Sequence, residues 1–282
     1  MLSIIICSRK KEIDSNLFEN IKKTVGCYYE LIVIDNSKNE KSIFEAYNDG
    51  ISKSKGHFFC FLHDDIIIHT NNWGNILLNL FNKDSRLGLI GVAGTKIKSK
   101  MPSAWWDCPH YQKAANLIQH FGDEKIVTWN YGFEQESNVE VVTIDGVFMA
   151  MRKNELISFD TRMKGFHNYD LNISLEHKKK GLKIIVTNEI LIEHFSLGNV
   201  NENWMFSTLK AHKIYNNYLP ISIPDIQNHE TIKLLEIKNA KRFMKQILSF
   251  GLNKKTINIW FNFFSFLVYS KFYLEYLKKI YK

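Results

Sequence analysis

Two adjacent carboxylates, Asp64 and Asp65, follow His63 at the end of an unbroken apolar run, Phe58–Leu62. A run of this length is typical of a strand buried on both faces in the middle of a parallel sheet. Carboxylates are costly to bury unpaired, but at the carboxyl end of such a strand they reach the edge where open α/β sheets bind ligands. The pair therefore suits a divalent cation that holds a substrate diphosphate. Alternatively, Asp64 and Asp65 only turn the chain or cap a helix.

Polar residues also follow the two apolar segments before this one. Ser8 and Arg9 come after residues 2–7, and Asp35 comes after residues 30–34. The carboxyl ends of parallel strands gather at one edge of a sheet, so we expect these side chains to lie together there. That edge is the predicted site.

The elements that would position this site alternate regularly. Apolar segments at residues 2–7, 30–34, 58–62 and 87–93 are separated by helical patterns at 15–24, 42–52 and 73–82. Ser42 and Glu45 form a capping box at the start of one of these helices. The β-α-β-α-β-α-β order predicts a parallel, helix-covered sheet with right-handed crossovers.

Residues 96–137 break this rhythm, because they are rich in aromatic and polar residues with no sustained period. Such a long insertion predicts a binding loop around Trp105 and Trp106; a loosely packed surface excursion is the alternative. Strands are expected again at 139–144, 146–151, 182–187 and 190–192, with helices at 154–158 and 171–180.

Length and composition describe an ordinary globular protein. The 282 residues can bury a full core, and 45% hydrophobic and 23% charged residues exclude wholesale disorder. The four cysteines include no CxxC pair, so we interpret Cys7 and Cys60 as buried thiols in a reducing compartment. The apolar N-terminus lacks a basic region before it, which favours a first strand over a signal peptide. We expect a cytoplasmic protein.

The basic charge is concentrated at the C-terminal end. Residues 230–282 contain eleven Lys and Arg and three Glu, a net +8 that equals the net charge of the whole chain. The remainder is near neutral, which argues against a nucleic-acid groove. The aromatic segment 257–269 is too short and polar to span a bilayer. It predicts either an in-plane helix at the inner face of the membrane or a helix that packs on the main domain or on a second subunit, as in a homodimer.

A series of segments resembles a GT-A-fold glycosyltransferase of the family 2 type. They are, in order, SIIICSR, LIVIDNS, AYNDGISKSKG, FFCFLHDD, IDGVFMAMRK, FDTRMKGFHNYDLNISL and IEHFSLG, and they span roughly residues 2–198. The resemblance implies a mixed α/β fold: a Rossmann-like GT-A sheet, mostly parallel and covered by helices. We expect the glycosyltransferase domain at residues 1–225 and a basic, aromatic-rich helical appendage at residues 226–282.

The resemblance also assigns nucleotide-sugar contacts. Ser8, Arg9 and Asp35 match positions that contact the nucleotide, and Asp35 could accept a hydrogen bond from a ribose hydroxyl or a uracil N–H. Asn48 falls where the family often has an Asn near the donor, although it could equally be an exposed helical residue.

The metal ligands follow from the same comparison. His63, Asp64 and Asp65 occupy the place of the family's D-x-D, so Asp65 would bind Mn²⁺ or Mg²⁺ and Asp64 would contact the ribose or the metal. His63 departs from the Asp common there. His194, with Ser196, matches a downstream H-x-S and would bind the metal or the diphosphate; the alternative is a satisfied structural histidine.

The catalytic base of inverting members precedes a helix, and the matching segment here is HNYDLN. Asp170 is its only carboxylate. Read as the family's E-D-x-D, the segment has His167 and Asn168 in place of the first two acids. Read as FHxYDxD, it has Asn172 in place of a later Asp. The base would deprotonate an acceptor hydroxyl; alternatively, Asp170 only caps the helix.

These features predict a metal-dependent inverting glycosyltransferase. It would move a sugar from a nucleotide-diphosphate sugar, first of all a UDP-sugar, to a hydroxyl of a glycan or lipid-linked acceptor in bacterial surface polysaccharide assembly. Trp105 and Trp106 would stack on sugar faces or close over the donor. One alternative is a nucleotidyltransferase, although no Gly-rich basic loop follows the first strand. The other is a non-catalytic nucleotide-sugar-binding relative.

Overall fold

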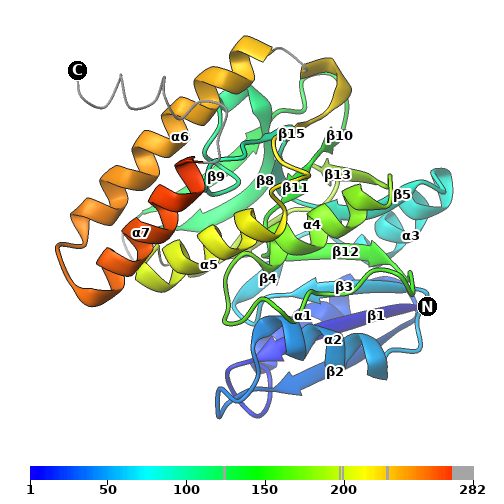
Figure 1. Ribbon diagram of the computed structural model, residues 1–282. Coiled ribbons are helices and arrows are strands. Elements are labelled where there is room, and N and C mark those ends of the chain that lie inside the picture. The colour runs from blue at the N-terminus through cyan, green and yellow to red at the C-terminus, as the bar shows by residue number, and fades with distance from the viewer. Residues whose placement is uncertain (123–124, 197, 199, 227–228, 269–282) are drawn as a thin grey trace.

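The computed structural model describes residues 1–122, 125–196, 198, 200–226 and 229–268, and a mixed seven-stranded sheet forms its centre (Figure 1). The strand order is β10-β13-β5-β12-β3-β1-β2. All neighbours pair in parallel except β12 with β3 and β5, and β10 with β13. The mostly parallel α/β sheet expected from the sequence is confirmed. The bounds are β1 Leu2–Ser8, β2 Tyr29–Asp35, β3 Phe58–Leu62, β5 Leu87–Gly91, β10 Asn138–Val141, β12 Phe148–Arg152 and β13 Lys183–Thr187.

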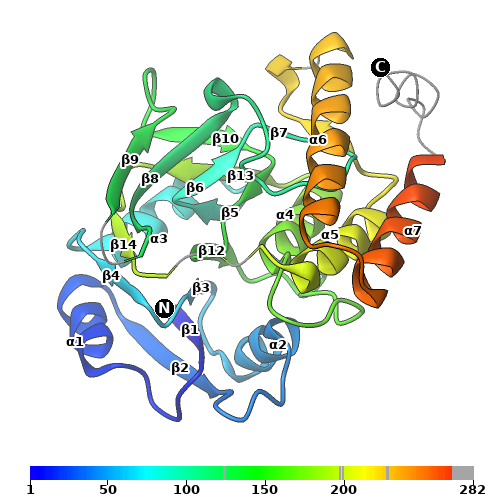
Figure 2. The same ribbon diagram turned by 90° about the vertical axis from the view of Figure 1, so that its left-hand side faces the viewer.

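Helices cover both faces of this sheet. Alternate residues of β1 point to opposite faces, so Ile5 joins one core and Ile4 and Ile6 join the other. The first core is covered by α2 (Ile43–Lys53), α4 (Tyr169–Lys179) and α5 (Glu202–Ile214), and the second by α1 (Ser15–Thr24) and α3 (Trp73–Lys83). Figure 2 shows α1 and α2 on opposite sides of the sheet. The predicted capping box of Ser42 and Glu45 is present.

A second sheet corrects the prediction for residues 96–137. Its order is β11-β6-β8-β14-β4, with β9 paired to β8, and β7 and β15 form a small separate pair. Residues 113–120 and 126–131, expected within a loop, form the antiparallel strands β8 and β9. Exposure in β9 alternates with a period of two, and the mixture of aromatic and polar residues obscured this pattern. The bounds are β4 Ile66–Ile68, β6 Ala93–Thr95, β7 Ile97–Lys98, β8 Lys113–His120, β9 Ile126–Tyr131, β11 Thr143–Ile144, β14 Ile192–His194 and β15 Ile221–Ser222.

The short helix expected at residues 154–158 is absent, and this prediction was wrong. The segment forms a turn instead, in which Asn154 Oδ1 accepts a hydrogen bond from the backbone N–H of Leu156 at 2.9 Å. An Asn that bonds to the backbone two residues on favours a turn over a helix.

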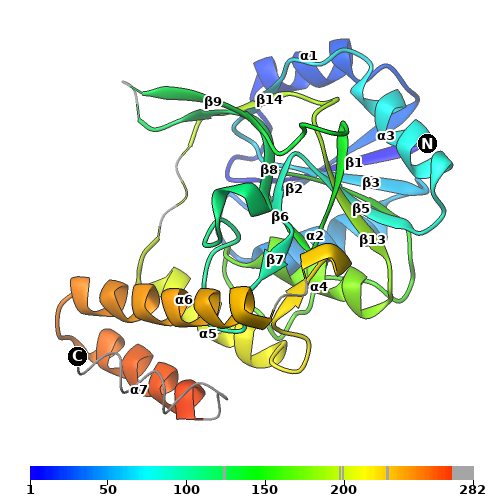
Figure 3. The same cartoon turned by 90° about the horizontal axis from the view of Figure 1, so that it is seen from above.

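From residue 229 on, the described residues form α6 (His229–Ser249) and α7 (Lys254–Val268), in agreement with the helical character expected there. Phe243 of α6 and Ile259 and Phe263 of α7 are buried in a core shared with Met205 of α5. Figure 3 shows α5, α6 and α7 packed side by side. Within the described part of the chain, every helix is too short or too polar to cross a membrane.

Candidate active site

A cavity of about 950 Å³ opens where the carboxyl ends of β1 and β3 face the second sheet. Its lining includes Ser8 and Arg9 after β1, and His63, Asp64 and Asp65 after β3. In the pairing of β1 with β2, Ser8 lies opposite Asp35. The polar strand ends therefore gather at one edge, and the size of the cavity suits a small-molecule ligand.

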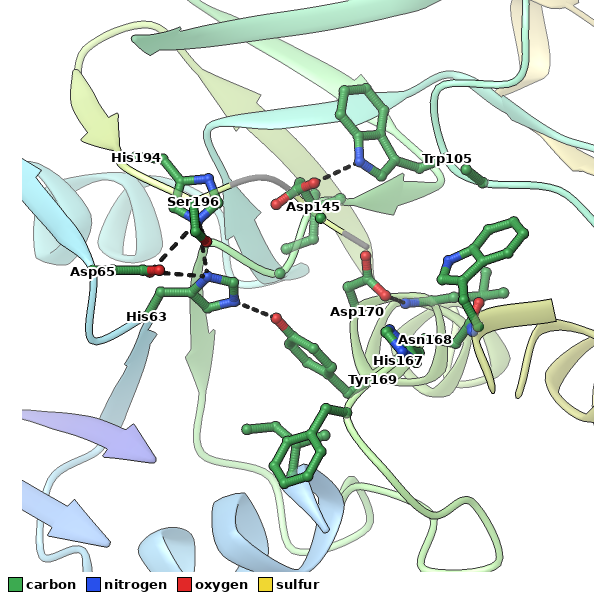
Figure 4. A pocket seen from close by; sticks show the side chains of 18 of the residues that line it. His63, Asp65, Trp105, Asp145, His167, Asn168, Tyr169, Asp170, His194 and Ser196 are labelled. Atoms are coloured by element: carbon green, nitrogen blue, oxygen red, sulfur yellow. Dashed lines mark hydrogen bonds and ion pairs between the residues drawn. The ribbon is translucent and has the colours of Figure 1, made fainter. Parts of the chain in front are cut away.

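Three side chains at this edge point their donor atoms at one another (Figure 4). His63 Nδ1 lies 3.3 Å from His194 Nε2. Asp65 Oδ1 lies 3.7 Å from His63 Nδ1 and 3.5 Å from His194 Nε2. Bonds of about 2.0–2.2 Å to one metal ion place neighbouring ligand atoms roughly 3–3.5 Å apart. The group His63, Asp65 and His194, here called the metal triad, could therefore hold one divalent cation.

Tyr169 orients the first histidine of the metal triad. Its hydroxyl contacts His63 Nε2 at 2.5 Å, and the Tyr169 side chain is buried at the start of α4. When Nδ1 binds a cation, the proton of the neutral imidazole resides on Nε2 and is donated to the Tyr169 oxygen. Burial lowers the pKa of His63, and the charge of His194 lowers it further. The imidazole is therefore neutral at pH 7, as a metal ligand must be.

Gln119 orients the second histidine. Its amide nitrogen donates to the backbone oxygens of His120 at 2.8 Å and Ser196 at 2.9 Å, which directs the amide oxygen toward His194 Nδ1 at 3.0 Å. An oxygen there accepts a hydrogen bond from the Nδ1–H of His194, so the proton stays on Nδ1 and Nε2 presents its lone pair to the other two side chains of the metal triad. The protein thus selects the tautomer that a metal ion requires.

The carboxylate of the metal triad is held ionised. Burial by itself raises the pKa of Asp65, but hydrogen bonding with His194 and Ser196 outweighs it and holds the pKa well below the usual range. Asp64 points elsewhere and pairs with Arg9, whose Nη2 lies 2.6 Å from Asp64 Oδ1 and 3.1 Å from Asp65 Oδ2. The adjacent aspartates therefore occupy different places, one in the metal triad and one beside Arg9.

A second carboxylate group lines the same cavity. Asp170 is the second residue of α4 and accepts a hydrogen bond from the backbone N–H of Leu171 at 2.8 Å. The N-cap position itself is occupied by Asn168, whose side chain makes no capping hydrogen bond. Burial and the negative charge of Asp145 raise the pKa of Asp170 to about 7. A carboxylate that titrates near neutral pH is suited to general acid–base chemistry.

Asp145 follows β11 and is held by two donors. Trp105 Nε1 donates to its Oδ2 at 2.6 Å, and the backbone N–H of Val147 donates to its Oδ1 at 2.8 Å. Trp105 and Trp106 both line the cavity. Figure 4 shows Trp105, Asp145 and Asp170 in the same pocket as the metal triad.

Two of the residues singled out from the sequence do not line the cavity. The Asn48 amide is bound to the backbone of Phe159, donating to its oxygen at 2.7 Å and accepting from its N–H at 2.9 Å. Asp35 is exposed and accepts from the backbone N–H of Ser37, while its neighbours Asn36 and Ser37 line the cavity.

Sequence reasoning missed several residues of the site. Asp145 lies in the quoted segment IDGVFMAMRK, so its acidic side chain at a strand end was a signal that was available. Tyr169 adjoins Asp170, but nothing in the sequence pairs it with His63. Gln119 gives no sequence signal, because its role depends on strand β8 lying beside β14.

The family of the chain is identified by its match to a family model. A family model described as "Glycosyltransferase like family" matches residues 3–220. Among solved structures, the chain is similar to that of GalNAc-T7 with UDP, GalNAc and Mn²⁺, at a TM-score of 0.49 and 14% identity over 86% of this chain and 55% of that one. It is also similar to A197 from STIV, at a TM-score of 0.38 and 12% identity over 70% of this chain and 86% of that one. The chain spans just over half the length of the GalNAc-T7 chain. No curated protein sequence matches it.

Proposed function

This chain belongs to the glycosyltransferase-like family, and from that premise we propose that it is a metal-dependent, inverting transferase that uses a nucleotide-diphosphate sugar. The observation that carries the proposal is the pairing, in one cavity, of the metal triad with a buried carboxylate that titrates near neutral pH. Sugar transfer needs both groups in one site, because a cation stabilises the diphosphate of the donor and a base removes the proton of the acceptor.

Asp170 is the base in this proposal. It takes the proton of an acceptor hydroxyl while the oxygen attacks the anomeric carbon of the donor sugar and the bond to the diphosphate oxygen breaks. The leaving nucleoside diphosphate keeps the bonding electrons, so the sugar is transferred with inversion by one displacement. A cation bound by the metal triad would neutralise the charge that develops on the leaving diphosphate. Asp145 remains beside Asp170 and tunes its proton affinity.

The donor occupies the half of the cavity formed by β1 and β3. Ser8, Arg9, Asn36 and Ser37 line this half and can bind base, ribose and phosphate. Asp35 is exposed next to Asn36 of the lining and could accept a hydrogen bond from a uracil N–H or a ribose hydroxyl, which supports a UDP-sugar. Two imidazole nitrogens and one carboxylate suit Mn²⁺ better than Mg²⁺, because Mg²⁺ strongly prefers oxygen ligands.

The acceptor occupies the aromatic half. Trp105, Trp106, Trp129, Tyr131 and Trp204 line the cavity there. Flat aromatic faces with a polar edge bind the apolar faces of sugar rings while leaving the hydroxyls free to hydrogen-bond. A glycan acceptor, free or lipid-linked as in surface polysaccharide assembly, is therefore the proposed substrate.

The turn between α6 and α7 is a proposed contact with an anionic membrane at its inner face. Leu252 is 90% exposed, and Leu248 and Phe261 are each 61% exposed. Lys254 and Lys255 follow directly in the sequence. Exposed apolar side chains beside lysines are the combination that anionic lipid surfaces attract.

Transfer with a panel of UDP-, GDP-, dTDP- and CMP-sugars and a glycan library, read by mass spectrometry, tests the function. We expect one donor to be consumed with Mn²⁺, and Asp170→Asn to abolish the product while nucleotide binding persists. Full sugar transfer by Asp170→Asn would show that Asp170 is not the base. Pyrophosphate release from a triphosphate and a sugar phosphate would identify a nucleotidyltransferase instead, and donor binding without turnover a non-catalytic relative.

A further inference from the structure

One loop beside the cavity, residues 99–107, is bound by a helix that contributes nothing to the cavity wall. Among the described residues, none from α6 lines the cavity. Three polar side chains of α6 nevertheless bond to the loop: Glu236, Asn239 and Arg242. They are three residues apart, a spacing that places neighbours along one side of a helix.

Glu236 makes the central contact. Its carboxylate is 1% exposed and accepts the backbone N–H groups of Lys100 at 2.5 Å and Met101 at 2.8 Å. His212 of α5 holds the other side of the same peptide, since its Nδ1 donates to the Lys100 oxygen at 2.9 Å. A buried carboxylate is costly unless donors surround it, so these bonds define one position for the start of the loop.

The other two contacts fix the two ends of the loop. Asn239 donates to Ser99 Oγ at 2.9 Å, and Arg242 Nη1 lies 2.6 Å from Asp107 Oδ1. The side chain of Asp107 is only 6% exposed. The Arg242 side chain is 55% exposed and reaches this carboxylate from the surface, while Asp107 Oδ2 accepts the backbone N–H of Ala104 at 2.8 Å. Arg242 therefore provides the charge partner on the Oδ1 side of Asp107, and Ala104 joins its other oxygen to the loop.

The loop carries Trp105 and Trp106 into the cavity, and Trp105 donates to Asp145 beside Asp170. We propose that Glu236, Asn239 and Arg242 are positioning residues for sugar transfer. By holding the loop 99–107, they fix the position of the two tryptophans in the acceptor half and, through Trp105, the orientation of Asp145. This inference rests on the proposed function and extends it to a helix beyond residues 3–220, the part that the family model matches.

Hydrogen exchange of the full-length chain tests the contact itself without any ligand. Glu236→Ala and Arg242→Ala should accelerate exchange at least tenfold in peptides that cover residues 99–107, and not in those that cover β1. Glu236→Gln keeps one acceptor oxygen, so its exchange rate at residues 99–107 should lie between those of Glu236→Ala and the wild-type chain. Lys238→Ala is the matched control, because Lys238 is exposed on the same helix and its removal also deletes one charge. Unchanged exchange at residues 99–107 in both alanine variants would overturn the inference.

Turnover separates positioning from general stability. Arg242→Ala should reduce nucleotide-sugar turnover about tenfold or more and shift its pH profile, while the affinity for UDP with Mn²⁺ stays within twofold of the wild-type chain. Arg242→Lys, which keeps a cation beside Asp107, should recover most of the rate. An equal loss of UDP affinity and turnover would show a structural role only and would overturn the inference. Failure of the wild-type chain to bind any nucleotide would count against the proposed function alone, and the exchange result would still decide the contact.

Discussion

Gln119 is an uncharged residue on which the metal triad depends. Its amide is fixed by backbone oxygens and selects the His194 tautomer that leaves Nε2 free. Gln119→Leu should therefore lower Mn²⁺ affinity about 10- to 100-fold, the usual effect of losing such a partner of a metal ligand. Titration calorimetry with Mn²⁺ measures it, with Asn130→Leu, an exposed amide on β9, as the control. Unchanged affinity would mean that His194 is not a ligand.

Asp145 and Asp170 predict a pH profile. Asp170 must be ionised to act as a base, and its pKa is raised to about 7, so the rate should rise with pH through that value. The charge of Asp145 contributes to that raised pKa, so Asp145→Asn should move the rise to lower pH. Initial rates between pH 5 and pH 9 provide the measurement. A shift to higher pH would contradict the assignment.

The same raised pKa makes a prediction about stability. A carboxyl with a higher pKa folded than unfolded favours the folded state at low pH, and this contribution is lost as the pH rises from about 4 to about 7. Asp170→Asn removes the cost of ionisation and should stabilise the fold at pH 8.5 by up to about 4 kcal/mol. Urea unfolding at pH 8.5 and pH 4.5 should show a much larger difference between variant and wild-type chain at the higher pH. A destabilised variant at pH 8.5 would show that Asp170 is ionised at little cost.

At the scale of the elements, Asn48 joins α2 to the segment before α4. Both its hydrogen bonds go to the Phe159 backbone, so we expect a structural role rather than donor contact. Asn48→Ala should lower the free energy of unfolding by about 1–3 kcal/mol, because it leaves backbone groups unpaired, and should leave nucleotide affinity unchanged. Denaturant unfolding and calorimetry with UDP and Mn²⁺ test both halves. A loss of nucleotide affinity without a change in the free energy of unfolding would instead support a contact between Asn48 and the donor.

Some strands of the structure can be predicted from the sequence alone, and others cannot. Strands β1 and β3 are unbroken apolar runs between helices with clear periodicity, and these were predicted with their polar ends. Strands β8 and β9 were missed for different reasons. β9 alternates exposed and half-buried residues of mixed aromatic and polar type, whereas the largely buried β8 has Asn116 and Gln119 among its apolar residues, so neither forms a clear apolar run. Asp65 was singled out from its place at a strand end and from the resemblance, and His194 and Asp170 from the resemblance. The contacts of Gln119 with His194 and of Tyr169 with His63 were not predicted, because the first depends on β8 pairing with β14 and the second on α4 lying beside the end of β3.

At the scale of the whole molecule, charge and apolar exposure meet at one end. The excess of basic residues lies in residues 230–282, and the exposed Leu252 stands at the turn between α6 and α7. Leu252→Ser combined with Lys254→Glu and Lys255→Glu should reduce co-sedimentation with anionic vesicles at least fivefold, since both apolar and electrostatic contributions are removed. Neutral vesicles are the control. Equal binding of the variant and the wild-type chain to anionic vesicles would exclude this turn as the contact.

The central claim is that one cation in the metal triad joins the nucleotide to the protein. The most direct test is thermal unfolding of the wild-type chain and of His194→Ala with UDP, GDP, dTDP and CMP, each with and without Mn²⁺. Ligands that bind the folded state raise the melting temperature by mass action. We predict that one nucleotide raises it in the wild-type chain only when Mn²⁺ is present, and that His194→Ala shows no such rise. A rise of equal size without metal, or in His194→Ala, would contradict the account.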